Sequence, residues 1–109
     1  MAALEIYLFK SAEEAEVAML GLEIFTLECR DMNVEDIDYE GHLAAVYSRL
    51  YRVQTVLGKL EIAATNFNFA SNYWHLHYKN RWASIPTPEE MRIQIEGADT
   101  YFGKPAWQK

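Results

Sequence analysis

The longest regular pattern of apolar positions runs from residue 43 to residue 78. Apolar or aromatic side chains recur there with alternating spacings of three and four, and only a serine interrupts them. The seam positions are Leu43, Val46, Leu50, Val53, Leu57, Leu60, Ala64, Phe67, Ser71, Trp74 and Tyr78. Such a heptad repeat is typical of a long helix with a coiled-coil-like seam. We therefore predict one central helix over residues 40–82, roughly 60 Å long at 1.5 Å per residue.

One stretch of this pattern is poor in strong helix formers. Residues 65–72 read Thr-Asn-Phe-Asn-Phe-Ala-Ser-Asn. Asn and Ser side chains can hydrogen-bond to their own backbone, which competes with helix formation. A kink or break at 65–72, with two helices in a hairpin, is therefore the alternative to the continuous helix that we expect.

A shorter helix is predicted over residues 12–30. The segment Ser11-Ala12-Glu13-Glu14 matches a capping box, in which the Ser11 hydroxyl accepts a hydrogen bond from the Glu14 amide. Apolar residues follow at helical spacing. They are Ala15, Met19, Leu22 and Phe25, and the face is widened by Val17, Leu20, Ile24 and Leu27. Residues 4–9 are apolar and are expected to form a short N-terminal arm or a first helical turn.

A third main helix is predicted to begin at Thr87. Thr87-Pro88-Glu89-Glu90 supplies a cap, a proline at the first helical position and a capping-box glutamate. Its apolar positions and its end are Met91, Ile95, Ala98 and Phe102, then Gly103 and Pro105. The polar connection before the central helix offers Asn33, Asp36 and Asp38 as caps. The expected fold class is all-α, with three main helices in a single domain that covers residues 1–109.

Composition and charge narrow the classes of function. Half of the residues are apolar, which argues against intrinsic disorder. The net charge of −6 repels polyanions and makes duplex binding unfavourable. No apolar run approaches the roughly 18 residues that a membrane span needs. Cys29 is the only cysteine, so it cannot form an internal disulfide, and a cytoplasmic location without membrane contact is expected.

The ionisable residues show no catalytic or metal-binding pattern. His75 and His77 are two positions apart, so on a helix they point about 200° away from each other and cannot share an ion. His42 is remote from both. The acidic clusters lie at predicted helix starts, where the helix dipole favours them without any chemistry. We therefore expect no metal site, no cofactor and no enzymatic activity.

The length of the central helix indicates self-association. The helix over 12–30 reaches only about half as far, so part of the long seam must be covered by another helix or by a second chain. We predict a homo-oligomer. The residues expected at its interface are Leu50, Val53, Leu57 and Leu60.

The segment 73–82 combines four aromatic rings, two histidines and two cations within ten residues. Trp, Tyr and Arg are enriched in protein–protein hot spots, and aromatic rings beside cations also suit unpaired bases. A purely structural explanation is that Trp74 and Tyr78 belong to the core, while the cations form the basic last turn of a helix. The predicted partner-binding residues are Tyr73, His77, Lys79, Arg81 and Trp82.

These observations favour a non-enzymatic interaction protein. We expect a self-associating adaptor, or a regulator that binds and modulates a larger protein. The alternative is an accessory factor that binds single-stranded nucleic acid through residues 73–82, although the net charge disfavours it.

Overall fold

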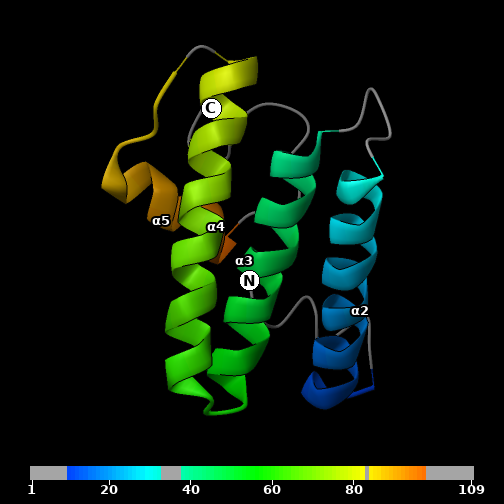
Figure 1. Cartoon of the computed structure of the whole chain (residues 1–109). Coiled ribbons are helices and arrows are strands. Elements are labelled where there is room, and N and C mark those ends of the chain that lie inside the picture. Colours follow the sequence, from blue (N-terminus) through cyan, green and yellow to red (C-terminus); the bar gives the residue numbers. More distant parts are fainter. Residues whose placement is uncertain (1–9, 33–37, 83, 98–109) are drawn as a thin grey trace.

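A computed structural model describes residues 10–32, 38–82 and 84–97. Within these ranges the chain forms only helices and no strand. They are α2 (Ala12–Asp31), α3 (Tyr39–Val56), α4 (Leu60–Arg81) and α5 (Pro88–Gly97), labelled as in Figure 1. The predicted all-α class is confirmed. The predicted arm at 4–9 and the helix end at 98–105 lie outside the described residues.

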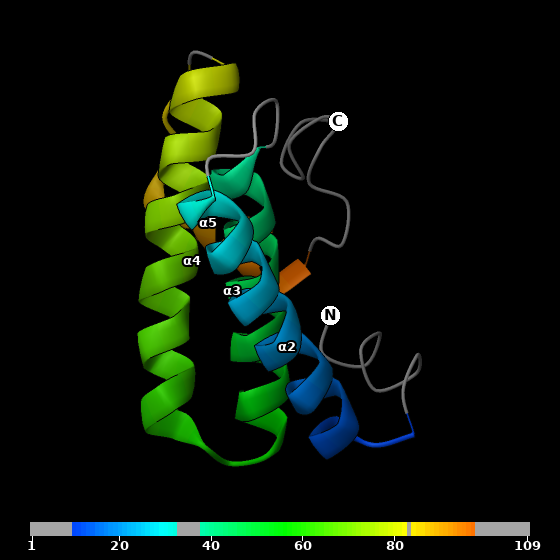
Figure 2. The same cartoon turned by 45° about the vertical axis from the view of Figure 1, so that its right-hand side comes forward.

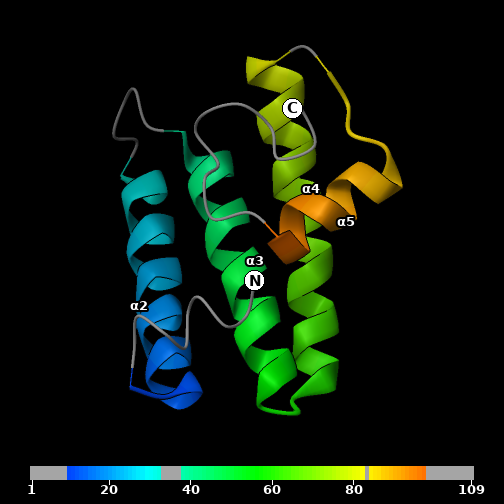
Figure 3. The same ribbon diagram turned by 180° about the vertical axis from the view of Figure 1, so that it is seen from behind.

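The three long helices lie side by side in one layer, with α3 in the middle (Figure 1). α3 and α4 run antiparallel and form the most extensive contact, while α2 covers the other side of α3. Figure 2 shows that α2 is inclined across α3. The short α5 lies across the back of the layer, where it contacts both α3 and α4 (Figure 3). The radius of gyration of 13.4 Å is that of a compact fold of this length.

A tight turn at residues 57–59 separates α3 from α4. The Gly58 amide donates to the Thr55 carbonyl (3.1 Å) and the Lys59 amide to the Gln54 carbonyl (2.9 Å). These two hydrogen bonds form a Schellman motif. Its glycine takes a positive φ of 76°, a conformation that is open to glycine because it has no Cβ. Helix α3 therefore ends here and the chain reverses.

The predicted continuous helix over 40–82 is thus wrong. The break that was considered at 65–72 is also misplaced, because α4 passes through that stretch without interruption. Tertiary packing overrides the weak helix propensity there. Ala70 is fully buried, and the Asn66 side chain is buried against α3, where its Nδ2 donates to Gln54 Oε1 (2.6 Å). Helices α3 and α4 therefore bury most of the seam within one chain, although Leu60 and Ala64 at the start of α4 stay exposed.

The core lies mainly between α3 and α4. Its largest buried side chains are Trp74, Tyr78, Leu43, Leu50 and Ile95. The rings of Trp74 and Tyr78 stack with their centroids 5.6 Å apart. The Trp74 indole N–H donates to the buried Ser48 hydroxyl (2.8 Å), which in turn donates to the Ala44 carbonyl (2.7 Å). The indole N–H and the Ser48 hydroxyl thus both have hydrogen-bond partners inside the apolar interface.

The helix starts agree with the capping signals. Ser11 Oγ accepts from the Glu14 amide (3.1 Å) and begins α2. Asp38 is the cap of α3, since its Oδ1 accepts from the Gly41 amide (2.9 Å). At the start of α5 the capping box is complete in both directions, between Thr87 and Glu90.

Candidate interaction surfaces

The aromatic and basic segment 73–82 divides between the core and the surface. Trp74, His77 and Tyr78 are fully buried. Tyr73 is half-buried, and its ring stacks on Tyr47 with centroids 5.7 Å apart. Most of the aromatic area of the segment therefore stabilises the fold. The burial of Trp74 and Tyr78 supports their interpretation as core residues.

Asp38 joins the start of α3 to the end of α4. Its Oδ2 lies 2.6 Å from His77 Nδ1, and its Oδ1 lies 3.3 Å from Arg81 Nε. Gly41 packs so closely against this group that an added Cβ would overlap the Asp38 carboxylate and lie 2.9 Å from His77 Nδ1. The carboxylate also caps α3, at the positive end of its dipole. A partner cannot reach His77 while these helices stay packed, whereas Arg81 pairs with Asp38 and keeps about half of its side chain exposed.

Three residues of the segment remain exposed. Lys79 and Trp82 lie on the surface, and Arg81 is exposed beyond its contact with Asp38. Trp82 is the C-cap of α4 and is 40% exposed. The predicted partner-binding set is thus reduced to a short surface at the end of α4.

The four residues predicted for self-association do not form one surface. Leu50 and Val53 are completely buried within the chain, and Leu57 is half-buried beside Val53. Leu60 alone is exposed, at 66%. The prediction of a homo-oligomer depended on an uncovered seam, and the α3–α4 hairpin buries six of its eleven residues and leaves only Leu60 and Ala64 exposed.

A buried polar cluster ties the first three helices together near the turn. Gln54 Nε2 donates to Glu16 Oε2 (3.1 Å), and Lys59 Nζ lies 2.7 Å from Glu16 Oε1. Asn66 completes the cluster through its hydrogen bond to Gln54. The hydrogen bond from Lys59 holds the pKa of Glu16 below its ordinary value. The cluster is fully connected, which is the condition for buried polar groups to be tolerated.

Two tyrosines, Tyr47 of α3 and Tyr73 of α4, join these helices to polar side chains farther along α2. Burial raises the pKa of Tyr47, and the neighbouring Glu23 raises it further. Arg30 donates to the Tyr73 hydroxyl (3.5 Å). Glu23 and Arg30 of α2 therefore contact tyrosines of α3 and α4.

The outward face of α2 is apolar, which the sequence pattern did not predict. Val17, Ile24 and Phe25 are 69%, 57% and 63% exposed, whereas Met19 is buried. The exposed large apolar residues of this helix are Val17, Leu20, Leu22, Ile24 and Phe25, followed by Met32 at its C-cap. We name the first five the α2 apolar face. Several of them had been assigned to a widened core face. Because apolar residues occur all round this helix, one neighbour cannot bury them all, and that distribution was the available signal.

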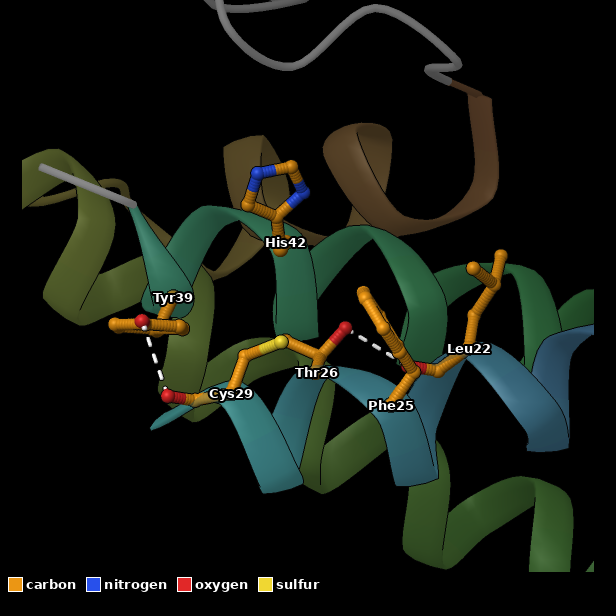
Figure 4. Close-up of a pocket in the computed structure, with 6 residues that line it drawn as sticks. All are labelled: Leu22, Phe25, Thr26, Cys29, Tyr39 and His42. Atoms are coloured by element: carbon orange, nitrogen blue, oxygen red, sulfur yellow. Dashed lines mark hydrogen bonds between the residues drawn. The ribbon is translucent and has the colours of Figure 1, made fainter. Parts of the chain in front are cut away.

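A groove lies between the α2 apolar face and α3. Its volume is about 220 Å³, and Leu22, Phe25, Thr26 and Cys29 from α2 line it together with Tyr39 and His42 from α3 (Figure 4). The Thr26 hydroxyl donates to the Leu22 carbonyl (2.8 Å) and the Tyr39 hydroxyl to the Cys29 carbonyl (3.3 Å). With both hydroxyls used internally, the groove presents mainly apolar surface.

Acidic residues lie at both ends of the α2 apolar face. Glu13 and Glu14 are exposed in the first turn of the helix, and Glu28 and Asp31 are exposed in its last turns. The one basic residue of α2 is Arg30, which lies 3.8 Å from Asp31. The exposed side of α2 therefore combines an apolar centre with a negative charge at each end.

Metal sites and membrane-spanning helices would point to other functions. In the described ranges, no group of three or more His, Cys, Asp or Glu side chains is arranged to hold a metal ion. None of the described helices is both long enough and apolar enough to cross a bilayer. Comparisons with protein-family models, with curated proteins and with solved structures found no match.

Proposed function

We propose that this chain is a non-enzymatic interaction protein, an adaptor or regulator that binds a larger protein through the α2 apolar face. The observation that carries the proposal is the exposure of Val17, Ile24 and Phe25 on a helix whose inner side already packs against α3. Contiguous exposed apolar surface that is bordered by polar residues marks interaction sites in folded proteins. The exposed end of α4, with Lys79, Arg81 and Trp82, is proposed as a second contact.

The buried aromatic rings support this function over nucleic-acid binding. Base stacking needs accessible ring faces, and Trp74 and Tyr78 are in the core. Phosphate contacts need basic side chains that are available to a ligand. Four basic side chains already pair with acidic groups of the chain, which reduces the positive charge that they offer to a phosphate. They are Arg30, Lys59, Arg81 and Arg92. No separate observation favours the single-stranded nucleic-acid alternative.

Affinity capture from the native cells tests the proposal. Three tagged proteins are compared: the wild type, Val17→Gln with Ile24→Gln in α2, and Leu60→Gln with Ile62→Gln in α4. Glutamine keeps good helix propensity, so both double variants should fold. The control pair removes exposed apolar area of the same kind from a different helix.

We expect a partner that the wild type and the α4 control retain and that the α2 variant loses. If the same proteins are captured by all three chains, the α2 apolar face is not the binding surface and the proposed function fails.

A further inference from the structure

We propose that the α2 apolar face receives a cationic amphipathic helix of the partner protein, with basic residues near both of its ends. This inference rests on the proposed function and specifies the chemistry of the partner. Recognition would follow the helix-in-groove mode, in which apolar side chains at positions i, i+3, i+4 and i+7 enter a hydrophobic groove.

The shape of the surface favours a helical occupant. Val17, Leu20 and Ile24 follow one another at helical spacing along the outer side of α2, and Gly21 lies among them. A Cβ added at Gly21 would meet no atom within 4 Å, so the surface is open at this point and a second helix can approach closely. The neighbouring groove of about 220 Å³ has room for one large apolar side chain of that helix.

The acidic residues at the ends of α2 favour a partner segment with positive charge. Glu13 and Glu14 at one end of the face and Glu28 at the other have no ion pair among the described residues. The two acidic ends are separated by 14 or 15 positions along α2, which corresponds to roughly 21–23 Å at 1.5 Å per residue. Lysine or arginine residues placed at that separation on a docked helix would face an acid at each end. Charge complementarity of this kind suppresses wrong partners and speeds association.

The same charges oppose a second copy of this chain as the occupant. Two α2 helices packed antiparallel about Gly21 would bring Glu14 of one chain opposite Glu28 of the other. Parallel packing would bring each acid opposite its own copy. Like charges placed together at an interface are unfavourable, so the partner is a different, basic segment.

The test is a titration with a synthetic 18-residue peptide made of leucine and lysine. Leucines occupy the i, i+3, i+4 and i+7 positions, and lysines occupy the first and last turns. Two control peptides accompany it, one with the same residues in a shuffled, non-periodic order and one with glutamate in place of every lysine. Binding is followed by nuclear magnetic resonance shifts of the α2 backbone amides, and by analytical ultracentrifugation of the free protein.

We expect saturable binding of the amphipathic cationic peptide, with the largest shifts along α2. Val17→Gln with Ile24→Gln should weaken binding at least tenfold, whereas Leu60→Gln with Ile62→Gln should leave it within about twofold. Glu13→Gln with Glu28→Gln should weaken binding and reduce its salt dependence between about 0.05 and 0.5 M, since surface charges are screened by salt. Glu61→Gln, an exposed acid on α4, is the matched control and should change neither.

Three results of the peptide and sedimentation experiments would overturn the inference, and a fourth result, given last, would overturn it without affecting the proposed function. One is equal binding of the cationic and the acidic peptides. Another is unchanged binding by the Val17→Gln, Ile24→Gln variant. The third is a wild-type dimer that this variant converts into monomers, because a second copy would then be the occupant. If no peptide binds but capture from cells still depends on α2, the inference fails and the proposed function stands.

Discussion

Helices α3 and α4 differ from α2 in how completely they are used by the fold. More than half of the residues of α3 are buried, and its contacts with α4 contain satisfied polar groups such as the Trp74–Ser48 hydrogen bond. In α2 only Ala12, Ala15, Glu16 and Met19 are buried, and the five large apolar side chains of the α2 apolar face are exposed. The hairpin thus provides stability, whereas α2 contributes a narrow inner stripe and leaves a wide surface available.

The strongest effect on stability should come from the hairpin core. Trp74→Ala removes a fully buried ring, its stacking on Tyr78 and its hydrogen bond to Ser48. We expect a loss of about 3–5 kcal/mol in the free energy of unfolding, measured by urea titration. A loss below about 1 kcal/mol would mean that the hairpin is not the principal core.

Two glycines allow a matched comparison of the regions. Gly41→Ala, in α3, should destabilise the protein by about 1–3 kcal/mol, because the new Cβ displaces Asp38 and His77. Gly21→Ala, in α2, should instead stabilise it by up to about 1 kcal/mol, since alanine favours a helix and the space is open. Thermal unfolding of both variants measures the difference. If both substitutions change the unfolding temperature by the same amount in the same direction, the expected difference in packing between α2 and α3 is wrong.

The buried side of α2 includes Glu16, so it should affect how the free energy of unfolding depends on pH. The pKa of Glu16 is lowered in the folded state by its hydrogen bond from Lys59, relative to an ordinary value of 4.5. The unfolded chain therefore binds this proton more readily, so the contribution of Glu16 is complete above about pH 4.5 and is lost as the pH falls through the folded value.

Glu16→Gln removes this titration. As the pH falls from about 5 to about 3, the wild type should lose more unfolding free energy than the variant. Glu61→Gln, with its exposed side chain, should follow the wild type. A Glu16→Gln profile parallel to the wild-type profile would show that the cluster with Lys59 and Gln54 does not form.

The exposed end of α4 should contribute to partner binding and little to stability, as we expect for the α2 apolar face. The rest of α4 should contribute mainly to stability. Trp82→Ala should change the unfolding free energy by less than about 1 kcal/mol, because 40% of the residue is already exposed and its amide hydrogen bond to Tyr78 belongs to the backbone. Capture of the partner should nevertheless be reduced. A loss of several kcal/mol in stability would assign Trp82 to the core and remove it from the proposed contact.

The local signals in the sequence predicted the helix starts well. Ser11 and Thr87 cap their helices through the expected hydrogen bonds, because a capping box involves only neighbouring residues. The seam residues Leu43, Leu50, Trp74 and Tyr78 are buried as their spacing indicated.

The turn at Gly58 was missed because the apolar repeat continues across it in phase. A heptad pattern indicates which face of a helix is apolar. It does not indicate whether the chain reverses, so that one half of the pattern packs against the other. The glycine that ends α3 was the local signal for the break. Weak helix propensity instead favours a break at residues 65–72, where packing against α3 outweighs it.

The candidate sites depended on tertiary neighbours that spacing alone does not identify. The contact between Asp38 and His77 joins residues far apart in the chain, so His77 could be taken for a surface residue. Val17 and Ile24 were assigned to the core because apolar character was equated with burial. A helix with apolar residues on every side has more of them than one neighbour can cover.

The division of α2 into a buried stripe and an exposed apolar face is tested most directly by a pair of truncations within that helix. Met19 is 6% exposed and Phe25 is 63% exposed, and both are large apolar side chains. The measurement is the urea unfolding free energy of Met19→Ala and of Phe25→Ala beside the wild type. We expect a loss of at least about 2 kcal/mol for Met19→Ala and of less than about 1 kcal/mol for Phe25→Ala. If Phe25→Ala loses as much stability as Met19→Ala, the outer face of α2 belongs to the core and cannot serve as the binding surface.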